Sequence, residues 1–334
     1  MRAAVCGTAA GGERVCDGYS GLPGEAGASA GMVAIRGGTF TMGDDEERPE
    51  ERPAHLVTVG DFWIDRHEVT NAQFARFVAA TGYVTVAERG LPAGARPDLP
   101  PELRVPGATV FTMPQGVLQV VDVSGWWKFV PGADWRHPHG PDSSITGKDN
   151  HPVVDLAYED ALAYARWLGR DLPTEAQWEY AARGGQEGAT YAWGDEYYDP
   201  AFGWRANTWQ GMFPLQDQAE DGHHGTAPVG CYPANGFGLF DMTGNVWEYA
   251  RDWWLPAHVA VAEADAGGPP LVMAASYGGA AGPSVVIKGG SYLCAPNFCA
   301  RYRPSARQPQ ELGLGASHLG FRTVLNRPIP PSQD

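Results

Sequence analysis

Short runs of alternating apolar and polar residues open the folded part of the sequence and predict β-strands. Residues 32–42 alternate large apolar with small or polar side chains around a Gly-Gly pair, which predicts a bent strand or a hairpin. Residues 55–59 and 61–65 repeat the alternation after an acidic turn at 44–53, and each predicts a further strand. The fold is therefore expected to begin with strands near Met32.

Helical periodicity is clear in three short stretches. Thr70-Asn-Ala-Gln73 is a capping box, whose side chains bond the free N–H groups of a first helical turn, and apolar residues follow at helical spacing until Gly82. Residues 158–168 predict a second helix, because their apolar residues fall on one face at helical spacing. A second capping box, Thr174-Glu-Ala-Gln177, predicts the start of a third helix, which ends at Gly184-Gly185. Three short helices cannot organise the whole chain.

The rest of the sequence predicts long loops joined by short strands. From residue 186 onward, turn residues interrupt the apolar runs every few positions. Residues 255–283 are rich in Gly and Ala with little apolar periodicity, so they predict an insertion or a mobile loop. Residues 1–31 have little to bury and predict a disordered tail, which leaves one domain over 32–325 and a C-terminal tail over 326–334.

The composition favours an α+β fold built as a single large domain with little regular secondary structure. The 334 residues include 44 Gly and 28 Pro, which indicate many turns and long pinned loops. The 12 Trp and 13 Tyr supply large rigid side chains that can fill a core between irregular segments.

Charge and hydropathy exclude several classes of partner. A net charge of −15 argues against nucleic acid, because a phosphate backbone favours clustered Lys and Arg. No apolar run approaches the ~20 residues of a membrane span, and residues 1–31 lack the apolar segment of a signal peptide. The sequence therefore predicts a soluble cytoplasmic protein without membrane contact.

Two cysteines in one loop carry the strongest chemical signal. Cys294 and Cys299 lie close together, whereas we expect no role for Cys231, which stands alone, or for Cys6 and Cys16 in the predicted tail. A close thiol pair can bind a metal, form a disulfide or react, and a reducing cytoplasm disfavours the disulfide. Zinc would need a second pair of ligands, which the sequence lacks at suitable spacing. The alternative without chemistry is that both cysteines are small hydrophobic side chains buried in the core.

Several motifs, taken with this loop, resemble the formylglycine-generating enzymes, also called sulfatase-modifying factors. The Gly-Asn-Val-Trp-Glu and Leu-Gly-Phe-Arg runs are typical of a wider superfamily with a C-type-lectin-like core, whereas the Trp-Arg-His-Pro and Cys-x4-Cys runs are narrower. The runs that carry the resemblance are Gly37-Gly-Thr-Phe-Thr-Met-Gly43, His67-Glu-Val-Thr-Asn71, Trp135-Arg-His-Pro-His-Gly-Pro-Asp-Ser143, Leu172-Pro-Thr-Glu-Ala-Gln-Trp-Glu-Tyr180, Asn207-Thr-Trp-Gln-Gly211, Gly244-Asn-Val-Trp-Glu248, Gly289 to Arg303 and Leu319-Gly-Phe-Arg322.

The resemblance implies an oxidase that converts one cysteine of a client sulfatase to Cα-formylglycine with O2 and a reductant. The client is expected to be an unfolded or nascent polypeptide with a Cys-x-Pro-x-Arg segment. The sequence has no Gly-rich loop for a flavin or nicotinamide after a strand, so a metal must supply the redox centre. The family assigns Cys294 and Cys299 to Cu(I), a soft ion that suits two thiolates.

Further site residues follow only from the resemblance. Ser291 and Trp247 match positions that line the oxygen pocket beside the copper, although Ser291 could equally satisfy a turn and Trp247 could be core. Phe298 and His318 are candidate client contacts. The residues between the cysteines lack the His and Tyr that some members have there, and residues 308–315 also depart from the family pattern, so client selectivity can differ.

Calcium is the second metal that the resemblance implies, and it would serve the fold rather than the reaction. Ca2+ prefers several oxygen ligands from carboxylates and backbone carbonyls. One family site is matched by Asp241, Gly244, Val246 and Glu248, with Gly and Val acting through their carbonyls. The other is matched by Asn207, Thr208, Asp221 and His223, with Thr and His acting through theirs. The alternative is that the two Asp side chains are solvated loop acids.

Two other functions stay open at this stage. A related iron-dependent sulfoxide synthase would need a His triad on an N-terminal helical bundle, but His137 and His139 lie in a loop rich in Pro and Gly with no such bundle before them. A non-catalytic lectin-like binding module would share the fold without the chemistry. Such a module would have no need of the cysteine pair.

Overall fold

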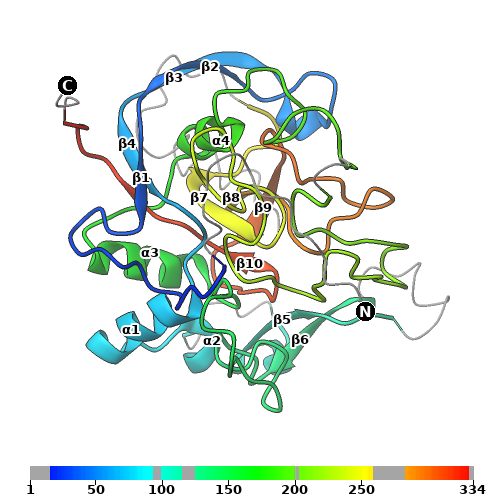
Figure 1. The fold of residues 1–334 in the computed structure, drawn as a ribbon. Helices are drawn as coiled ribbons and strands as arrows, with labels where there is room; N and C mark the ends of the chain where they lie inside the picture. The colour runs from blue at the N-terminus through cyan, green and yellow to red at the C-terminus, as the bar shows by residue number, and fades with distance from the viewer. Residues whose placement is uncertain are drawn as a thin grey trace.

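Short strands and helices joined by long loops make up this α+β domain (Figure 1). The computed structural model describes residues 16–92, 99–114, 125–198, 200, 203–258 and 283–330. The helices are α1 (Asn71–Thr81), α2 (Val86–Arg89), α3 (Tyr158–Trp167) and α4 (Glu175–Arg183), with 3-10 helices η1 (Pro49–Glu51) and η2 (Pro101–Leu103). The strands are β1 (Met32–Ile35), β2 (Gly38–Met42), β3 (His55–Val59), β4 (Phe62–Asp65), β5 (Gly107–Phe111), β6 (Trp127–Pro131), β7 (Trp247–Trp253), β8 (Ser284–Lys288), β9 (Arg307–Glu311), β10 (Leu319–Gly320) and β11 (Val324–Leu325).

The central sheet of the described chain has the strand order β10-β7-β8-β9 (Figure 1). Strand β8 is antiparallel to both β7 and β9, while β10 runs parallel to β7. A second sheet, β1-β4-β11, joins the beginning of the domain to its end. Two antiparallel pairs, β2 with β3 and β5 with β6, complete the described strands.

Residues 32–42 form the predicted bent strand and not a hairpin. Strand β1 pairs with β4, whereas β2 pairs with β3, so the two halves of the run belong to different sheets. Gly37 lies at the bend, where a Cβ atom would meet the carbonyl oxygen of Val59 at 2.3 Å. A residue without a side chain is therefore required where these two backbones meet.

The three predicted helices are confirmed as α1, α3 and α4. Thr70 caps α1 by accepting from the Gln73 backbone N–H at 3.2 Å, and Gly82 ends it in the left-handed conformation. Thr174 caps α4 with the same box. The single turn of α2 was not predicted, although Thr85 begins it with a third capping box. Among the described residues, none of the helices has the length and apolar character needed to cross a membrane.

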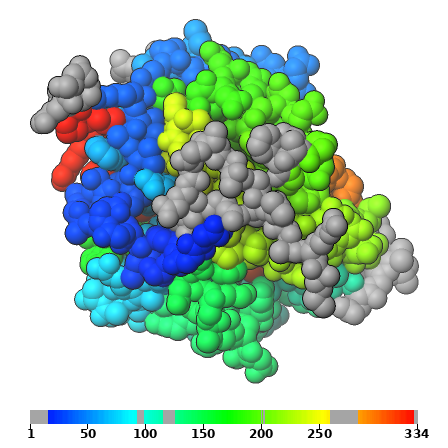
Figure 2. Space-filling view, in the orientation of Figure 1, coloured from blue at the N-terminus to red at the C-terminus, as the bar shows by residue number. Residues whose placement is uncertain are grey.

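Residues 16–31, which were expected to belong to a disordered tail, pack on the domain. The Tyr19 hydroxyl lies 3.2 Å from Nε2 of His67, and Arg170 donates to two backbone carbonyls of the segment at 3.0 and 2.8 Å. Figure 2 shows this segment in blue along the surface beside α1. The predicted boundary at Met32 is therefore too late. Residues 1–15, and residues 259–282 of the predicted insertion, lie outside the described part of the chain.

Aromatic side chains fill the core, as the composition predicts, and the core extends to the cysteine loop. One cluster of buried residues includes Phe74, Tyr164 and Tyr249 together with Cys294 and Cys299. The rings in it make edge-to-face and stacked contacts, and the Phe74 and Tyr164 centroids are 5.9 Å apart. The cysteine loop is therefore part of the packed interior.

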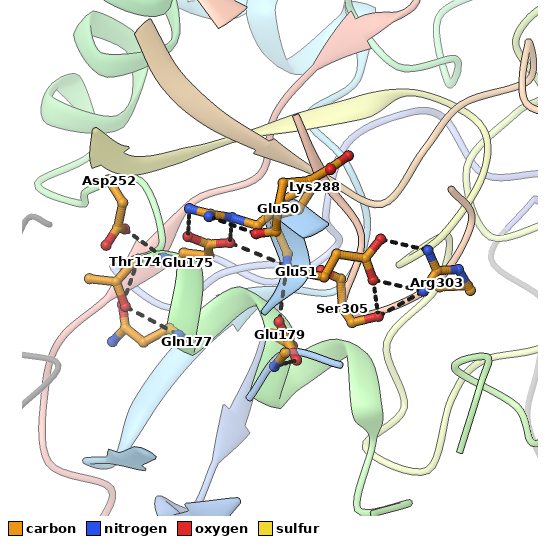
Figure 3. A network of polar contacts seen from close by, with 12 residues as sticks. Glu50, Glu51, Thr174, Glu175, Gln177, Glu179, Asp252, Lys288, Arg303 and Ser305 are labelled. Atoms are coloured by element: carbon orange, nitrogen blue, oxygen red, sulfur yellow. Dashed lines mark hydrogen bonds and ion pairs between the residues drawn. The ribbon is translucent and has the colours of Figure 1, made fainter. Parts of the chain in front are cut away.

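Buried ion pairs join α4 to the central sheet (Figure 3). Lys288 on β8 is fully buried, and its Nζ lies 3.0 Å from Glu179 and 3.5 Å from Glu175. Arg307 on β9 binds Glu175 through two hydrogen bonds of 2.7 and 2.9 Å. Burial alone would raise the pKa of Glu179, but Lys288 and Arg183 lower it to about 2. These contacts hold the helix and both strands together through charge, because buried carboxylates need cationic partners.

Lys288→Met should destabilise the fold strongly. The substitution keeps an unbranched side chain but leaves two buried carboxylates without this cation, a change that costs about 3–5 kcal/mol in buried ion pairs. Denaturant unfolding followed by tryptophan fluorescence would measure the loss. Lys128→Met, at an exposed position of β6, is the matched control and should change the free energy of unfolding little. Equal losses in both variants would contradict this account of the network.

Candidate active site

The loop after β8 folds back on itself and buries both cysteines. Gly290 has φ 74°, and a Cβ atom there would meet the carbonyl oxygen of Arg301 at 2.7 Å, so the two arms of the loop are in contact. The backbone N–H of Cys294 donates to the Ser291 carbonyl at 2.9 Å. Cys294 and Cys299 are 2% and 7% exposed, and they do not form a disulfide. The structure thus brings together the thiol pair that the sequence singled out.

The two sulfurs have opposite acid–base behaviour. Burial and the neighbouring Cys299 raise the pKa of the Cys294 thiol. The hydrogen bond from Cys294 lowers the pKa of Cys299, and the guanidinium and backbone N–H of Arg301 lower it further. Backbone N–H groups of Ser291 and Arg301 also act on the Cys294 sulfur. The pair therefore favours one thiol donating to one thiolate, and a thiolate is the form of cysteine that binds a metal.

Ser291 and Trp247 are buried beside the pair. Ser291 is fully buried, and its Oγ accepts from the backbone N–H of Leu293 at 3.2 Å, which is the turn contact considered from the sequence. Trp247 begins β7 and belongs to the same core cluster as both cysteines. Its backbone N–H donates to the His318 carbonyl at 2.9 Å, which places β10 next to the site. Both residues thus support the loop through these contacts.

Phe298 and His318 lie on one aromatic surface, formed with Trp126, Trp127 and Phe213. Phe298 is 48% exposed and stacks on Phe213 at 4.6 Å between ring centroids, and Trp126 packs against both. The Trp127 and His318 rings are 4.5 Å apart. Burial lowers the pKa of His318 to about 3, and its Nδ1 has no hydrogen-bond partner among the described residues. The surface therefore exposes the apolar Phe298 ring, while the neutral imidazole Nδ1 of His318 is buried behind it.

Most of this surface was not predicted from the sequence. Asn297 joins it to the cysteine loop, because its Nδ2 donates to the Phe213 carbonyl at 3.1 Å. Phe111 on β5 stacks on Phe213 at 5.5 Å and reaches Trp127 at 5.7 Å, and Met212 is 58% exposed beside them. These residues come from distant segments without a shared motif. The high Trp and Phe content was the only available signal.

The first set of predicted calcium ligands is already hydrogen-bonded within the protein. Asn207 and Thr208 are buried, while Asp221 and His223 are partly exposed. The Asp221 carboxylate accepts from the Tyr232 hydroxyl at 2.7 Å and from the His223 backbone N–H at 3.0 Å. The Asn207 side chain donates to a backbone carbonyl at 2.9 Å. The structure therefore gathers these residues in one loop region.

The second set of predicted calcium ligands lies among buried carboxyl groups that outnumber the cationic side chains near them. Arg322 binds Glu248 through bonds of 2.6 and 2.7 Å, and the Trp178 indole donates to it at 2.9 Å. Glu68 is fully buried, and both of its carboxylate oxygens lack partners among the described residues. Burial, followed by the charges of Asp241 and Glu248, raises the pKa of Glu68 well above its usual range. A raised pKa keeps a buried carboxyl group protonated and neutral, whereas a bound cation would favour its ionised form.

Side chains alone do not complete a metal site in this region. In the part of the chain that the structure describes, no group of three or more His, Cys, Asp and Glu side chains is arranged to hold a metal. Burial raises the pKa of Asp241 to about 7, and Gly244 and Val246 are buried nearby in sequence. A calcium ion would therefore need backbone carbonyls among its ligands, as the resemblance implies.

Comparisons with known proteins are consistent with this fold. Residues 20–327 match the family model described as the sulfatase-modifying factor enzyme 1-like domain. A formylglycine-generating enzyme from Mycobacterium tuberculosis is 52% identical over 297 residues, which cover 88% of this chain and 97% of the relative. The solved structure of PvdO from Pseudomonas aeruginosa is 26% identical with a TM-score of 0.59, covering 90% of this chain and 98% of that one.

Some similar proteins are named as inactive. The inactive C-alpha-formylglycine-generating enzyme 2 of Bos taurus is 36% identical over 315 residues, which cover 92% of each chain. Membership of the family therefore establishes the fold of this chain and its common ancestry with these proteins. Because some relatives are named as inactive, the activity has to be argued from the residues of the site. On the match over residues 20–327, the chain belongs to the sulfatase-modifying factor enzyme 1-like family.

Proposed function

We propose that this protein is an oxidoreductase that converts a cysteine in a client sulfatase to Cα-formylglycine. The observation that carries the proposal is the buried, non-disulfide pair Cys294 and Cys299 below a partly exposed aromatic surface. The 52% identity to a named formylglycine-generating enzyme over nearly the whole of that relative supports the same activity. A binding module without chemistry would have no use for two sulfurs held in this way.

The reaction needs O2 and a reductant to balance. The client side chain loses its sulfur as hydrogen sulfide, its β-carbon loses two electrons, and one oxygen atom becomes the aldehyde oxygen. The second oxygen atom becomes water with two further electrons from a reductant such as a thiol. No side chain in the site can transfer these electrons to O2 alone, so a redox cofactor is required.

Copper(I) is the cofactor that fits the donor set. Two adjacent sulfurs, one of them with a lowered pKa, are soft ligands that favour Cu(I) over hard ions. Cys294 and Cys299 would hold the ion, and it would supply the electron transfer to O2. Ser291 and Trp247 would bound the space beside it, and their burial excludes water from the oxidising centre.

The aromatic surface would bind the client. Phe298 directly precedes Cys299, so a chain lying on its ring comes close to the sulfur pair. Exposed aromatic and Met side chains suit an extended, unfolded or nascent segment such as Cys-x-Pro-x-Arg. His318 packs on Trp127 at the edge of this surface, with a ring-centroid distance of 4.5 Å, and would help to hold the Trp127 ring in place for the client.

Anaerobic titration with Cu(I) should give one tightly bound copper per chain. Cys294→Ser and Cys299→Ser should each abolish tight binding, because a single thiolate cannot hold the ion in two-coordinate geometry. Competition with a chromophoric Cu(I) chelator would measure this. Cys231→Ser is the matched control outside the loop and should bind copper as the wild type does. Equal affinity in all four proteins would exclude the cysteine pair as the copper site.

A synthetic peptide containing Cys-x-Pro-x-Arg should be modified by the protein with copper, O2 and a thiol reductant. Mass spectrometry should show a peptide in which one sulfur and two hydrogens are replaced by one oxygen. Cys299→Ser should reduce this product to background, and a peptide with Ser in place of Cys should remain unchanged. If peptides with several different client sequences all remain unmodified, the oxidase proposal is wrong and a non-catalytic binding module is favoured.

Calcium is a second proposal, and it concerns stability. The buried carboxyl groups of Asp241 and Glu68 support a cation close to β7, because burial raises the pKa of both and a cation would offset the cost of ionising them. The loop region of Asn207 and Asp221 would supply the other site. A ligand that binds only the folded protein stabilises it, and loop-rich domains benefit because calcium ties irregular segments together.

Adding Ca2+ to chelator-treated protein should therefore raise its melting temperature. Saturation at about 100 times the dissociation constant would correspond to about 2.7 kcal/mol. Asp241→Asn should diminish the shift, whereas Asp142→Asn at an exposed position should leave it intact. Differential scanning calorimetry would measure both. An unchanged melting temperature in the wild type, with and without Ca2+, would contradict the calcium proposal.

A further inference from the structure

An apolar cavity lies beside α2 and the antiparallel strands β5 and β6, which Figure 1 shows close together. Its volume is about 340 Å³, and ligand pockets in proteins occupy about 300–1,000 Å³. The side chains that line it include Leu91, Leu103, Val105, Phe129, Leu312 and Leu314. Among the described residues of its wall, Glu311 alone carries a charge. The cavity therefore suits one or two large apolar side chains and not a highly charged ligand.

Part of the cavity wall is exposed. Val105 is 41% exposed, Gly313 is also exposed, and Leu103 and Leu314 are half-buried. Apolar side chains around such a hollow are in contact with water, and an apolar partner that covers them gains the free energy of their burial. The cavity can therefore be reached from outside, and it favours an occupant that brings aliphatic surface.

The cavity and the aromatic surface share one face of β5 and β6. Thr109 and Phe129 lie opposite each other, and both line the cavity. Two residues further along, Phe111 lies opposite Trp127, with 5.7 Å between their ring centroids. Residues two apart on a strand have side chains on the same face, so these two pairs are neighbours. The strands therefore lead directly from the cavity to the rings of the aromatic surface.

The segment after β9 makes the same connection. Residues 312–314 line the cavity, and His318 belongs to the aromatic surface. Between them the segment is hydrogen-bonded to β5, because the Thr109 N–H donates to the Gly315 carbonyl at 2.9 Å. The Thr109 carbonyl accepts from the Ser317 N–H at 3.0 Å. Two adjacent segments of backbone thus join the cavity to the aromatic surface.

The length of this path suits an extended polypeptide. From Phe298, which directly precedes Cys299, ring-centroid steps of 4.6 and 5.5 Å lead through Phe213 to Phe111. Thr109 is two residues further, about 7 Å along the strand, and an extended chain rises about 3.3 Å per residue. A client with its cysteine at Cys299 would therefore reach the cavity with a side chain about five to seven residues away.

We propose that this cavity is a second binding site for the client, which takes one large aliphatic side chain about five to seven residues from the reacting cysteine. The inference rests on the proposed function and adds a flanking residue to what a client needs. Because the cavity continues the surface proposed for the client, the client is favoured as its occupant over a second copy of the chain or a free small molecule. Residues 311–314, in the segment that departs from the family pattern, would then contribute to client selectivity.

Binding of labelled peptides to the copper-loaded full chain, followed anaerobically by fluorescence anisotropy, tests the proposal without turnover. The reference peptide has Cys-x-Pro-x-Arg between flanks of Gly and Ser, and each test peptide has one Leu at about five to seven residues before or after the cysteine. Leu at the position that reaches the cavity should lower the Kd by about 10-fold, because one aliphatic side chain is buried. If no test peptide binds more tightly than the reference peptide, the inference is wrong.

Two variants change the cavity in different ways. Val105→Asp introduces a charge at its exposed wall, and Gly313→Leu fills part of it, because a Cβ atom at Gly313 would lie 3.1 Å from Cδ2 of Leu91. Each should remove the gain from the Leu peptide while leaving the Kd of the reference peptide unchanged, which also shows that the variant is folded. Val84→Asp is the matched control, since Val84 is 51% exposed and does not line the cavity.

The possible outcomes separate this inference from the proposed function. If both cavity variants keep the gain from Leu, or if Val84→Asp loses it equally, the inference is wrong while the proposed function stands. Dimerisation of the wild type that Val105→Asp abolishes would assign the cavity to a second copy of the chain, and the inference would again be wrong. If the wild type neither binds the reference peptide nor modifies it when O2 and a thiol reductant are supplied, the proposed function is wrong as well.

Discussion

The position of Cys299 depends on buried ion pairs that cross the domain. Lys288 ends β8 just before the cysteine loop and is held by two carboxylates of α4, while Arg303 follows the loop and is held by Glu51 of η1. The loop between them has turns rather than a strand or helix, so its own backbone gives it little rigidity. Charge-assisted hydrogen bonds at both ends of the loop hold it in place, as the backbone hydrogen bonds of strands and helices do elsewhere.

Local features of this fold could be predicted because short segments determine them. Thr70 and Thr174 cap their helices within three residues of sequence, so a capping box predicts both starts. The bend at residues 32–42 followed from its Gly-Gly pair, but its partners did not, since β1 pairs with β4 and β2 with β3. Strand pairing depends on packing between distant segments.

In the site, too, the features within one segment could be predicted from the sequence, and those that join distant segments could not. The Cys294 and Cys299 pair was recognisable because both residues lie in one loop within a family motif. Phe213 and Trp126, which complete the aromatic surface, belong to separate segments whose approach only the folded chain reveals. The predicted tail failed for a related reason, because residues 16–31 bind largely through backbone carbonyls, which no side-chain pattern encodes.

The same loop holds the residue that would bind the client and the residue that would react with it. Phe298, which would contact the client, and Cys299, which would meet its thiol, are adjacent, and Arg48 holds the Cys299 carbonyl while Asn297 holds the aromatic surface. A shift of the loop would move the binding ring and the sulfur together. Long-range ion pairs can therefore keep the distance between the Phe298 ring and the Cys299 sulfur constant even in a domain with little regular structure. That constancy matters because oxidation of one chosen carbon requires the reacting groups to be held in a fixed geometry.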